Sequence, residues 1–444
     1  MDIGLVGSGG REHAIAEALT KCPERDRLFV YGSSINIGIE QISQSYRVGL
    51  LSEIEPIVSF FQEKSVDYIV VGPELPLIHG VADALRAVNI PVVGPNQDQA
   101  RLEGNKAFMR DLMEEYIGQG NPRWCVVKDI KEAQNFINEV GQAVIKPTGL
   151  TGGKGVQVMG VHLQSLEETI DIVGQLIQEN GSVLLEERLV GEEFSRMAFI
   201  SDGVIVPIPV AQDFKYAFEG DRGGMTGGMG SYTMADGSMP FLNNTDIEQA
   251  DRQMAKVIAA LESVTGVPYR GFLYGQFMAT HQGVSLIEFN VRLGDPEAIN
   301  EMALLKCDAV EVFRQIANGN LKPETVIFAN QSSLCKYLVP AGYPDEIQSD
   351  LLFSLDENRF EQAGFSVRYA SVVKDNSHWK TLGSRTLAIV GLGESPGILS
   401  EKLESLLVDI EPHVLRHRKD IGSNETLQQK VDHMLMLRAE SYHG

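Results

Sequence analysis

Three polar residues at alternate positions, Glu288, Asn290 and Arg292, have the types and spacing of a site that binds metal ions and phosphate. In a β-strand, side chains two positions apart share one face and lie about 7 Å apart. A carboxylate and an amide oxygen at that separation suit Mg²⁺ ions bridged by substrate phosphates. The alternative is a polar face turned to solvent, but the following turn adds the carboxylates of Asp295 and Glu297, which favours the site. The other face should carry Ile287, Phe289 and Val291.

A glycine-rich segment at 149–155 follows a predicted strand that ends at Lys146. Glycines let backbone N–H groups turn inward around phosphate oxygens. The segment is not a Walker A loop, because Thr148 stands where that motif has glycine and Gly155 follows the lysine. A mobile turn with a solvated lysine is the alternative interpretation, and the nearby Lys146 favours phosphate binding.

The segment 7–13 resembles a dinucleotide-binding fingerprint only in part. Glu12 replaces the third glycine, and no acidic residue ends the second predicted strand at 31–34. A helix N-terminus offers free N–H groups and about half a positive charge, so a phosphate or phosphosugar fits better than NAD. His13 is expected to be a packed or capping histidine rather than a catalytic one.

Apolar periodicity predicts the elements that position these residues. The first hundred residues alternate β-rich runs with amphipathic helices, which favours an open parallel sheet with its ligand crevice at the carboxyl ends of the strands. Loops at one edge of that sheet would be 7–10, 72–74 and 94–95. After Arg101 the pattern becomes α+β and mainly antiparallel, with helices capped by Ser165 and Thr245 and a long hairpin from Gly271 to Arg292. A β-rich segment at about 331–422 and a polar tail at 423–444, helical or disordered, complete the chain.

Composition narrows the class of protein. The length of 444 residues predicts about three domains at roughly 150 residues each. Lys and Arg number 38 against 60 Asp and Glu, a net charge of −22, so nucleic acid and membrane partners are not expected.

No apolar run approaches the roughly 18 residues of a membrane span, and the first residues indicate a strand rather than a signal peptide, so we expect a cytoplasmic protein. The sequence lacks zinc-protease and serine-hydrolase signatures. Four cysteines without Cys-x-x-Cys spacing are expected to be reduced core residues: Cys22, Cys125, Cys307 and Cys335.

Taken together, the motifs resemble the phosphoribosylamine–glycine ligase family of ATP-grasp enzymes. The match is collinear from residue 4 to residue 422 and leaves only the tail outside it. The segments that carry it are 9–14, 71–77, 102–106, 149–156, 227–230 and 287–297. The resemblance implies an α/β and α+β multidomain fold, with an N-terminal open parallel sheet, a central ATP-grasp region with a mobile lid, and a small β-rich C-terminal region. The expected domains are 1–103, 104–328 with a lid at about 122–190, 329–422, and the tail 423–444.

The resemblance also implies the reaction and its residues. The enzyme would use ATP to join glycine to 5-phosphoribosylamine through a glycyl phosphate, giving glycinamide ribonucleotide, ADP and phosphate. The ATP phosphates, the lid over them, adenine and ribose would lie at Lys106, Lys146, Gly152, Gly153, Lys154, Gly155, Glu186, Leu189 and Glu193. The two other substrates would contact Gly9, Gly10, Asn36, Glu74, Asp213, Lys215, Arg292 and Asp295. Implied catalytic residues are Arg292, Asp295 and Lys154, and implied ligands of Mg²⁺ or Mn²⁺ are Glu288 and Asn290.

Several positions depart from the familiar family pattern and indicate a divergent branch. Phe214 and Tyr216 stand where histidine and arginine are usual, and Gly224 and Met225 precede the Gly-Gly-Met-Gly turn. These departures concern substrate contacts and leave the expected ATP and metal residues in place. Two other functions remain open, namely an ATP-grasp ligase with a different acceptor and a non-catalytic nucleotide sensor. A monomer or weak dimer is expected, with transient contact to the enzyme that supplies phosphoribosylamine.

Overall fold

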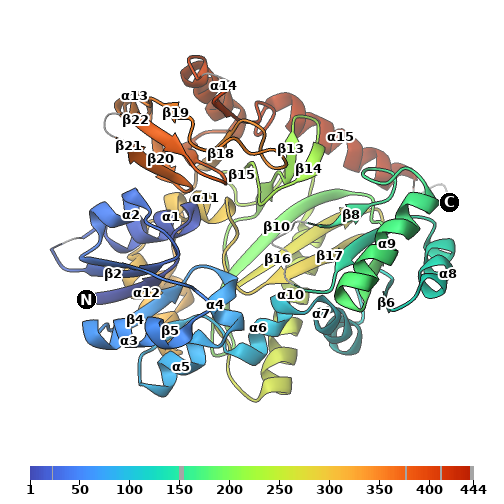
Figure 1. Cartoon of the computed structure of the whole chain (residues 1–444), viewed down its shortest axis with the longest axis horizontal. Helices are drawn as coiled ribbons and strands as arrows, with labels where there is room; N and C mark the ends of the chain where they lie inside the picture. The colour runs from blue at the N-terminus through green and yellow to red at the C-terminus, as the bar shows by residue number, and fades with distance from the viewer. Residues whose placement is uncertain (23, 150–154, 376–377, 411–412, 441–444) are drawn as a thin grey trace.

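A computed structural model of the full chain describes residues 1–22, 24–149, 155–375, 378–410 and 413–440. The predicted site residues Gly152, Gly153 and Lys154 lie outside the described residues. Figure 1 shows a parallel sheet near the N-terminus, a green lid on the opposite side of the molecule, and a long sheet between them that continues into the C-terminal region.

The N-terminal region is a five-stranded parallel sheet in the order β3-β2-β1-β4-β5. Its strands are β1 (Asp2–Val6), β2 (Arg27–Gly32), β3 (Ser45–Val48), β4 (Tyr68–Val71) and β5 (Val92–Val93). Its helices are α1 (Gly10–Leu19), α2 (Ile37–Ile42), α3 (Ile54–Lys64), α4 (Glu74–Ile78), α5 (Val81–Ala87) and α6 (Gln97–Gly104). The central strands β1 and β4 are almost wholly buried, as expected for a parallel sheet covered on both faces. The predicted open sheet is confirmed, with the loops after β1, β4 and β5 at one edge.

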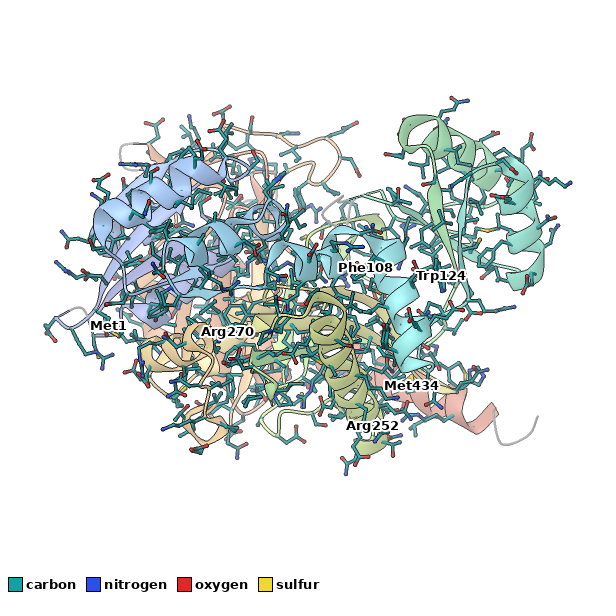
Figure 2. The ribbon with its side chains drawn as sticks, turned by 90° about the horizontal axis from the view of Figure 1, so that it is seen from below. Met1, Phe108, Trp124, Arg252, Arg270 and Met434 are labelled. Atoms are coloured by element: carbon teal, nitrogen blue, oxygen red, sulfur yellow. The ribbon has the colours of Figure 1, made fainter. Side chains whose placement is uncertain are left out.

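A small lid follows α7 (Lys106–Leu112) and a π-helical turn at Met113–Ile117. Its antiparallel sheet has the order β6-β9-β7-β8 and its own core, centred on Ile137, Ile145 and Val173. Figure 2 shows the lid standing out from the body of the molecule, with Trp124 labelled on one of its strands. The lid elements are β6 (Trp124–Val127), α8 (Ile130–Val140), β7 (Ala143–Pro147), β8 (Gln157–Val158), α9 (Leu166–Asn180) and β9 (Val183–Glu187).

The central sheet has ten strands, and all its strand pairs are antiparallel. Eight follow the order β17-β16-β10-β12-β15-β18-β23-β20, and β11 and β24 pair beside them. The first five strands and their neighbours are β10 (Glu192–Ser201), β11 (Val204–Pro207), β12 (Ala211–Asp213), β15 (Gly230–Thr233), β16 (Arg270–Thr280) and β17 (Gly283–Asn290). The hairpin predicted between Gly271 and Arg292 is therefore confirmed. A separate hairpin, β13 (Tyr216–Phe218) with β14 (Arg222–Met225), adjoins this sheet, and the helices are α10 (Asn244–Thr265), α11 (Glu297–Leu304) and α12 (Ala309–Asn318).

The C-terminal region extends the same sheet, because β18 pairs with β15 through four residues. After a 3-10 turn at Pro323–Thr325 come β18 (Ser332–Pro340), α13 (Glu357–Gln362), β20 (Phe365–Tyr369), β23 (Leu387–Gly393), α14 (Pro396–Leu407) and β24 (Leu415–Arg416). A separate three-stranded sheet follows the order β19 (Leu352–Phe353), β22 (His378–Thr381) and β21 (Val372–Asp375). The tail forms α15 (Asn424–Glu440), so the helical alternative for this segment is confirmed.

Two local predictions were wrong in part. Of the four cysteines only Cys335 is buried in the core, whereas Cys22 is exposed and the other two are half-buried. The helix predicted to be capped by Thr245 begins two residues earlier than that cap implies, because its N-cap is Asn243, whose side chain accepts the Asp246 N–H at 3.0 Å. The Ser165 cap is confirmed by its bond from the Glu168 N–H at 3.1 Å. Among the described residues, no helix is both long and apolar enough to cross a membrane.

Candidate active site

A cavity of about 270 Å³ lies where the N-terminal region, the lid, the central sheet and the C-terminal region meet. The N-terminal region contributes Arg11 and Glu74, the lid contributes Lys146, and the C-terminal region contributes Arg385. The central sheet and its loops supply most of the remaining wall: Glu193, Asp213, Lys215, Thr226, Gly227, Tyr274, Ile287, Glu288, Asn290, Arg292, Gly294, Asp295 and Glu297. Many residues that the sequence singled out, from segments far apart in the chain, therefore face one space.

The end of β17 reaches this cavity through a β-bulge. Gln276 pairs with Glu288, but the next residue, Phe277, pairs with Leu286, so Ile287 is an extra residue in the strand. The prediction that Ile287 shares the apolar face with Phe289 and Val291 is wrong, because a bulge re-aims side chains that strict alternation would place oppositely. Phe289 and Val291 are buried as expected, whereas Ile287 lines the cavity.

Glu288 is an ionised carboxylate at the centre of the site. Burial alone would raise its pKa, but the cations of Lys215 and Lys146 outweigh burial and lower the pKa to about 2. The Lys215 Nζ lies 3.7 Å from Glu288 Oε1, and the Asn290 amide nitrogen donates to the same oxygen at 3.4 Å. The remaining face of the carboxylate borders the cavity.

A divalent cation fits the pair Glu288 and Asn290. One anionic and one amide oxygen are the hard ligands that Mg²⁺ prefers, and such sites usually complete their coordination with phosphate and water. Within the described ranges no group of three or more His, Cys, Asp or Glu side chains is arranged to hold a metal by protein ligands alone. The donor set is therefore suited to a metal that arrives with a phosphorylated substrate.

Lys146 is held in place by a network of buried charged residues. Its Nζ lies 2.7 Å from Glu186 Oε2 and donates to the Ile287 carbonyl at 3.2 Å. Arg110 on α7 binds Glu186 through both its Nε, at 2.7 Å, and its Nη2, at 2.9 Å. Burial would raise the pKa of Glu186, but Arg110 and Lys146 hold it below its ordinary value. Glu186 thus supports Lys146, and it is not among the residues that line the cavity.

A second group of acidic residues surrounds Lys215. The Gln276 amide donates to Glu193 Oε2 at 3.0 Å and to Asp213 Oδ1 at 3.3 Å, and the Lys215 Nζ lies 4.0 Å from Asp213 Oδ2. Burial raises the pKa of both Glu193 and Asp213. Although burial lowers the pKa of Lys215, the acidic neighbours raise it further than burial lowers it. Glu297, whose pKa burial raises to about 7, completes this group. Such a carboxylate-rich wall can hold a substrate amine.

Arg292 and Asp295 also line the cavity. The guanidinium of Arg292 lies 3.2 Å from Glu103 Oε1 and 3.6 Å from Glu74 Oε2. Arg385 donates to Asp295 Oδ2 at 2.7 Å. Tyr337 donates to the other oxygen of Asp295, also at 2.7 Å.

The sequence reasoning missed three arginines. Arg110 stands four residues after Lys106 on one helix, a spacing that could have flagged it. Arg11 lies within the segment 9–14 but was not predicted as a site residue, and it lines the cavity together with Glu74. No local sequence pattern marks Arg385 as a site residue, because its partner Asp295 lies 90 residues away in the chain.

Other predicted residues lie outside the cavity lining. The Gly9 N–H donates to Glu12 Oε2 at 2.6 Å, and Gly10 begins α1 with its Cα against the Tyr337 hydroxyl. The Asn36 amide is buried and donates to the carbonyls of Ser8, Gly9 and Tyr369, while its oxygen caps α2. These three positions therefore shape the first loops of the parallel sheet.

The remaining predicted ATP residues lie near the lid. Lys106 is half-buried, and its Nζ donates to the Gly149 carbonyl at 3.1 Å. Gly155 has φ +86°, a conformation that favours glycine. Leu189 lines a different cavity, of about 570 Å³, beside the two chain crossings into the lid.

Comparisons with known proteins agree with this arrangement. Residues 1–103 match the family model of the phosphoribosylglycinamide synthetase N domain, and residues 104–298 match that of its ATP-grasp (A) domain. A phosphoribosylamine–glycine ligase of Methanopyrus kandleri is 41% identical over 98% of this chain and 99% of its own length. A ligase of the same name from Methanosarcina barkeri is 40% identical over 99% of this chain and 100% of its own length.

Solved structures give the same result. The crystal structure of phosphoribosylamine–glycine ligase from Thermotoga maritima has a TM-score of 0.76 and 28% identity, covering 95% of this chain and all of that one. A biotin carboxylase domain from Hydrogenobacter thermophilus, 16% identical with a TM-score of 0.69 and covering 98% of this chain and 93% of its own, shares the fold. The predicted multidomain ATP-grasp fold is therefore confirmed. On full-length identity and on both domain matches, the chain belongs to the phosphoribosylglycinamide synthetase family.

Proposed function

We infer that this protein joins glycine to 5-phosphoribosylamine with ATP and produces glycinamide ribonucleotide, ADP and phosphate in purine biosynthesis. Relatives that carry the name phosphoribosylamine–glycine ligase match it over nearly their whole length. The observation that carries the proposal is the single cavity in which the ionised Glu288 and Asn290 lie beside Lys146 and Lys215. That combination serves a phosphoryl transfer from a metal-bound nucleotide.

In the first step, a carboxylate oxygen of glycine bonds to the γ-phosphorus of ATP as the bridge to the β-phosphate breaks. Both reactants are anionic, so the site must neutralise charge and hold the groups in line. Lys146 and Lys215 supply fixed positive charge on two sides of Glu288. Glu288 and Asn290 would hold Mg²⁺ or Mn²⁺, which when bound shields the phosphate charge.

Glycine would lie between Arg292 and Asp213. The forked donors of Arg292 suit the carboxylate and then the acyl phosphate. The buried Asp213 suits the ammonium group, with Lys215 nearby to favour its ionised form. We assign Asp295 the role of fixing the turn after Arg292, since both its oxygens are bonded by Tyr337 and Arg385.

In the second step, the amine of phosphoribosylamine attacks the carbonyl carbon of glycyl phosphate, loses its proton, and displaces phosphate. Glu74 and Arg11 border the cavity from the N-terminal region, where the predicted phosphosugar contacts Gly9, Gly10 and Asn36 shape the adjoining loops. For the lid we propose Gly152 to Gly155 with Lys154. The further nucleotide contacts that we propose are Lys106, Lys146, Glu186, Leu189 and Glu193. A closed lid would protect the acyl phosphate from water.

We further propose the division into domains at 1–103, 104–328, 329–422 and 423–444, with the lid at about 122–190. The protein would act in the cytoplasm as a monomer or weak dimer. Because phosphoribosylamine is unstable, transient contact with the enzyme that supplies it would help delivery.

An omission experiment tests the function. ADP release should require ATP, glycine and phosphoribosylamine together, and the product should carry glycine in amide linkage. Turnover that needs neither glycine nor phosphoribosylamine would reject this function, and turnover with another acceptor would indicate a different ATP-grasp ligase. A purine-requiring strain complemented by a Glu288→Ala variant without turnover would indicate a sensor.

A further inference from the structure

The terminal helix α15 packs beside the proposed active site although it lies beyond both matched domains. It contacts β10 and β16, and its Met434 is only 1% exposed. Figure 1 shows α15 in red running along the upper side of the central sheet, and Figure 2 labels Met434 on it. A helix that buries apolar surface there could serve stability alone, so its polar contacts decide whether it does more.

The first polar contact is with Glu192, the first residue of β10. Its Oε2 lies 2.7 Å from the Lys430 Nζ, and its Oε1 lies 2.7 Å from the His433 Nδ1. Glu192 is 8% exposed, so one helix holds both oxygens of a largely buried carboxylate. The next residue is Glu193, which lines the cavity. Fixing Glu192 therefore fixes the backbone that carries a cavity residue.

The second contact is with Phe214, which stands between Asp213 and Lys215. The Lys430 Nζ lies 5.5 Å from the centre of the Phe214 ring, and the Arg418 guanidinium lies 5.0 Å from it. Distances below about 6 Å allow cation–π attraction. Phe214 is 2% exposed, so its ring is held in place among these groups.

Phe214 in turn holds a cavity loop by its backbone. Its N–H donates to the Gly230 carbonyl at 3.0 Å, and its carbonyl accepts the Met229 N–H at 2.7 Å. These bonds tie Phe214 to the end of the Gly-Gly-Met-Gly turn, whose Gly227 lines the cavity. The position of Phe214 thus affects the residues on both of its sides and the turn opposite.

The two residues that Lys430 contacts, Glu192 and Phe214, each stand next to an acidic residue that accepts a hydrogen bond from the Gln276 amide. That amide donates to Glu193 at 3.0 Å and to Asp213 at 3.3 Å. We propose that Lys430 is a positioning residue, which orients Glu193 through Glu192 and so supports nucleotide binding. Through Phe214 it also holds Asp213, the proposed contact of the glycine ammonium group. The proposal rests on the proposed function, because it takes this cavity to be the nucleotide site.

Nucleotide binding measured by titration calorimetry, with ATP and Mg²⁺ as the probe, tests this role independently of ligase turnover. Lys430→Met keeps the length of the side chain and removes its charge, and we expect the Kd for ATP to rise about fivefold or more. Lys430→Arg keeps the cation and should stay within about twofold of the parent protein. Lys402→Met, the same change at an exposed lysine of α14, is the matched control and should leave the Kd unchanged.

Glu192→Gln weakens the same ion pair by removing the charge of its acidic partner. It should raise the Kd for ATP, and the double variant with Lys430→Met should lose less than the product of the two single effects. If Lys430→Met fails to fold, Glu192→Gln serves as the test variant in its place. An unchanged Kd in folded Lys430→Met and Glu192→Gln, with only a lower Tm, would overturn the proposal. A parent protein that binds ATP without making the ligase product would reject the proposed function and leave this test intact.

Discussion

Glu288 is a buried carboxylate that stays ionised because Lys215 and Lys146 face it. We predict that Glu288→Gln lowers kcat/KM for ATP by about 100-fold or more, because removing a preorganised charge at a transition state costs on this order. The loss should be largest at low Mg²⁺ concentration, where the weakened metal site is least occupied. Steady-state kinetics across a Mg²⁺ series measures both effects.

A matched control is Glu311→Gln on α12. Glu311 also has a pKa lowered to about 2, in this case first by its hydrogen bond with Arg314, but it lies on the surface. This variant should retain the activity and Mg²⁺ dependence of the parent protein. Equal losses in the two variants would contradict a specific role for Glu288.

Glu103 should make stability depend on pH. Burial raises its folded pKa from 4.5 to about 7, against the opposing effect of Arg292. Between these values the folded protein retains a proton that the unfolded chain has released, so the contribution of Glu103 to the unfolding free energy falls as pH rises. Relative to the parent protein, Glu103→Gln should gain up to about 3 kcal/mol between pH 4.5 and pH 8.

Urea unfolding of both proteins at several pH values measures this difference. Surface carboxylates titrate alike in the two proteins, so their contributions cancel. A difference that is constant over this range, or that grows in favour of the parent protein as pH rises, would contradict a raised pKa for Glu103.

Sequence alone predicted the residues whose role follows from a local pattern. Glu288, Asn290 and Arg292 share a strand end, and the structure places all three on the cavity wall. It could not predict the bulge at Ile287, because that depends on pairing with β16. Nor could it predict Arg385, whose contact with Asp295 requires the assembled fold.

At the scale of elements, helix α10 provides a test of capping. The Asn243 side chain accepts the Asp246 N–H, and the Asp246 carboxylate accepts the Asn243 N–H at 2.8 Å. We predict that Asn243→Ala lowers the free energy of unfolding by about 1 kcal/mol, the usual cost of losing an N-cap. Thr245→Ala, at the position favoured by the sequence pattern, should cost less than half as much. Urea unfolding should show this order, and the reverse order would place the cap at Thr245.

Helices and strands were predictable from the sequence where apolar residues followed one regular pattern over many positions. The parallel strands β1 and β4 and the hairpin of β16 and β17 follow from runs of buried residues. The start of α10 was misplaced because Asn243 and Thr245 are both good caps, and only the packing of the helix selects one. The pairing of β18 with β15 joins residues about 100 apart, which no local pattern encodes.

At the scale of the whole molecule, Arg385 links the C-terminal region to the site. It donates to Asp295 Oδ2 at 2.7 Å and to the Gly227 carbonyl at 2.9 Å. We predict that Arg385→Met lowers kcat/KM for glycine or phosphoribosylamine by about 10- to 100-fold, since a small misplacement of reacting groups can cost that much. The Kd for ATP should change by less than threefold. Arg359→Met, at an exposed ion pair with Asp409, is the control. A loss confined to ATP binding would contradict this assignment.

The central claim is that the cavity between the four regions binds a nucleotide with its metal at Glu288 and Asn290. A crystal structure of the protein with ADP, Mg²⁺ and glycine tests it most directly. The account predicts a metal ion within about 2.0 to 2.2 Å of an oxygen of each residue, with the phosphates directed toward Lys146. ADP bound elsewhere, with Glu288 and Asn290 free of metal, would contradict it.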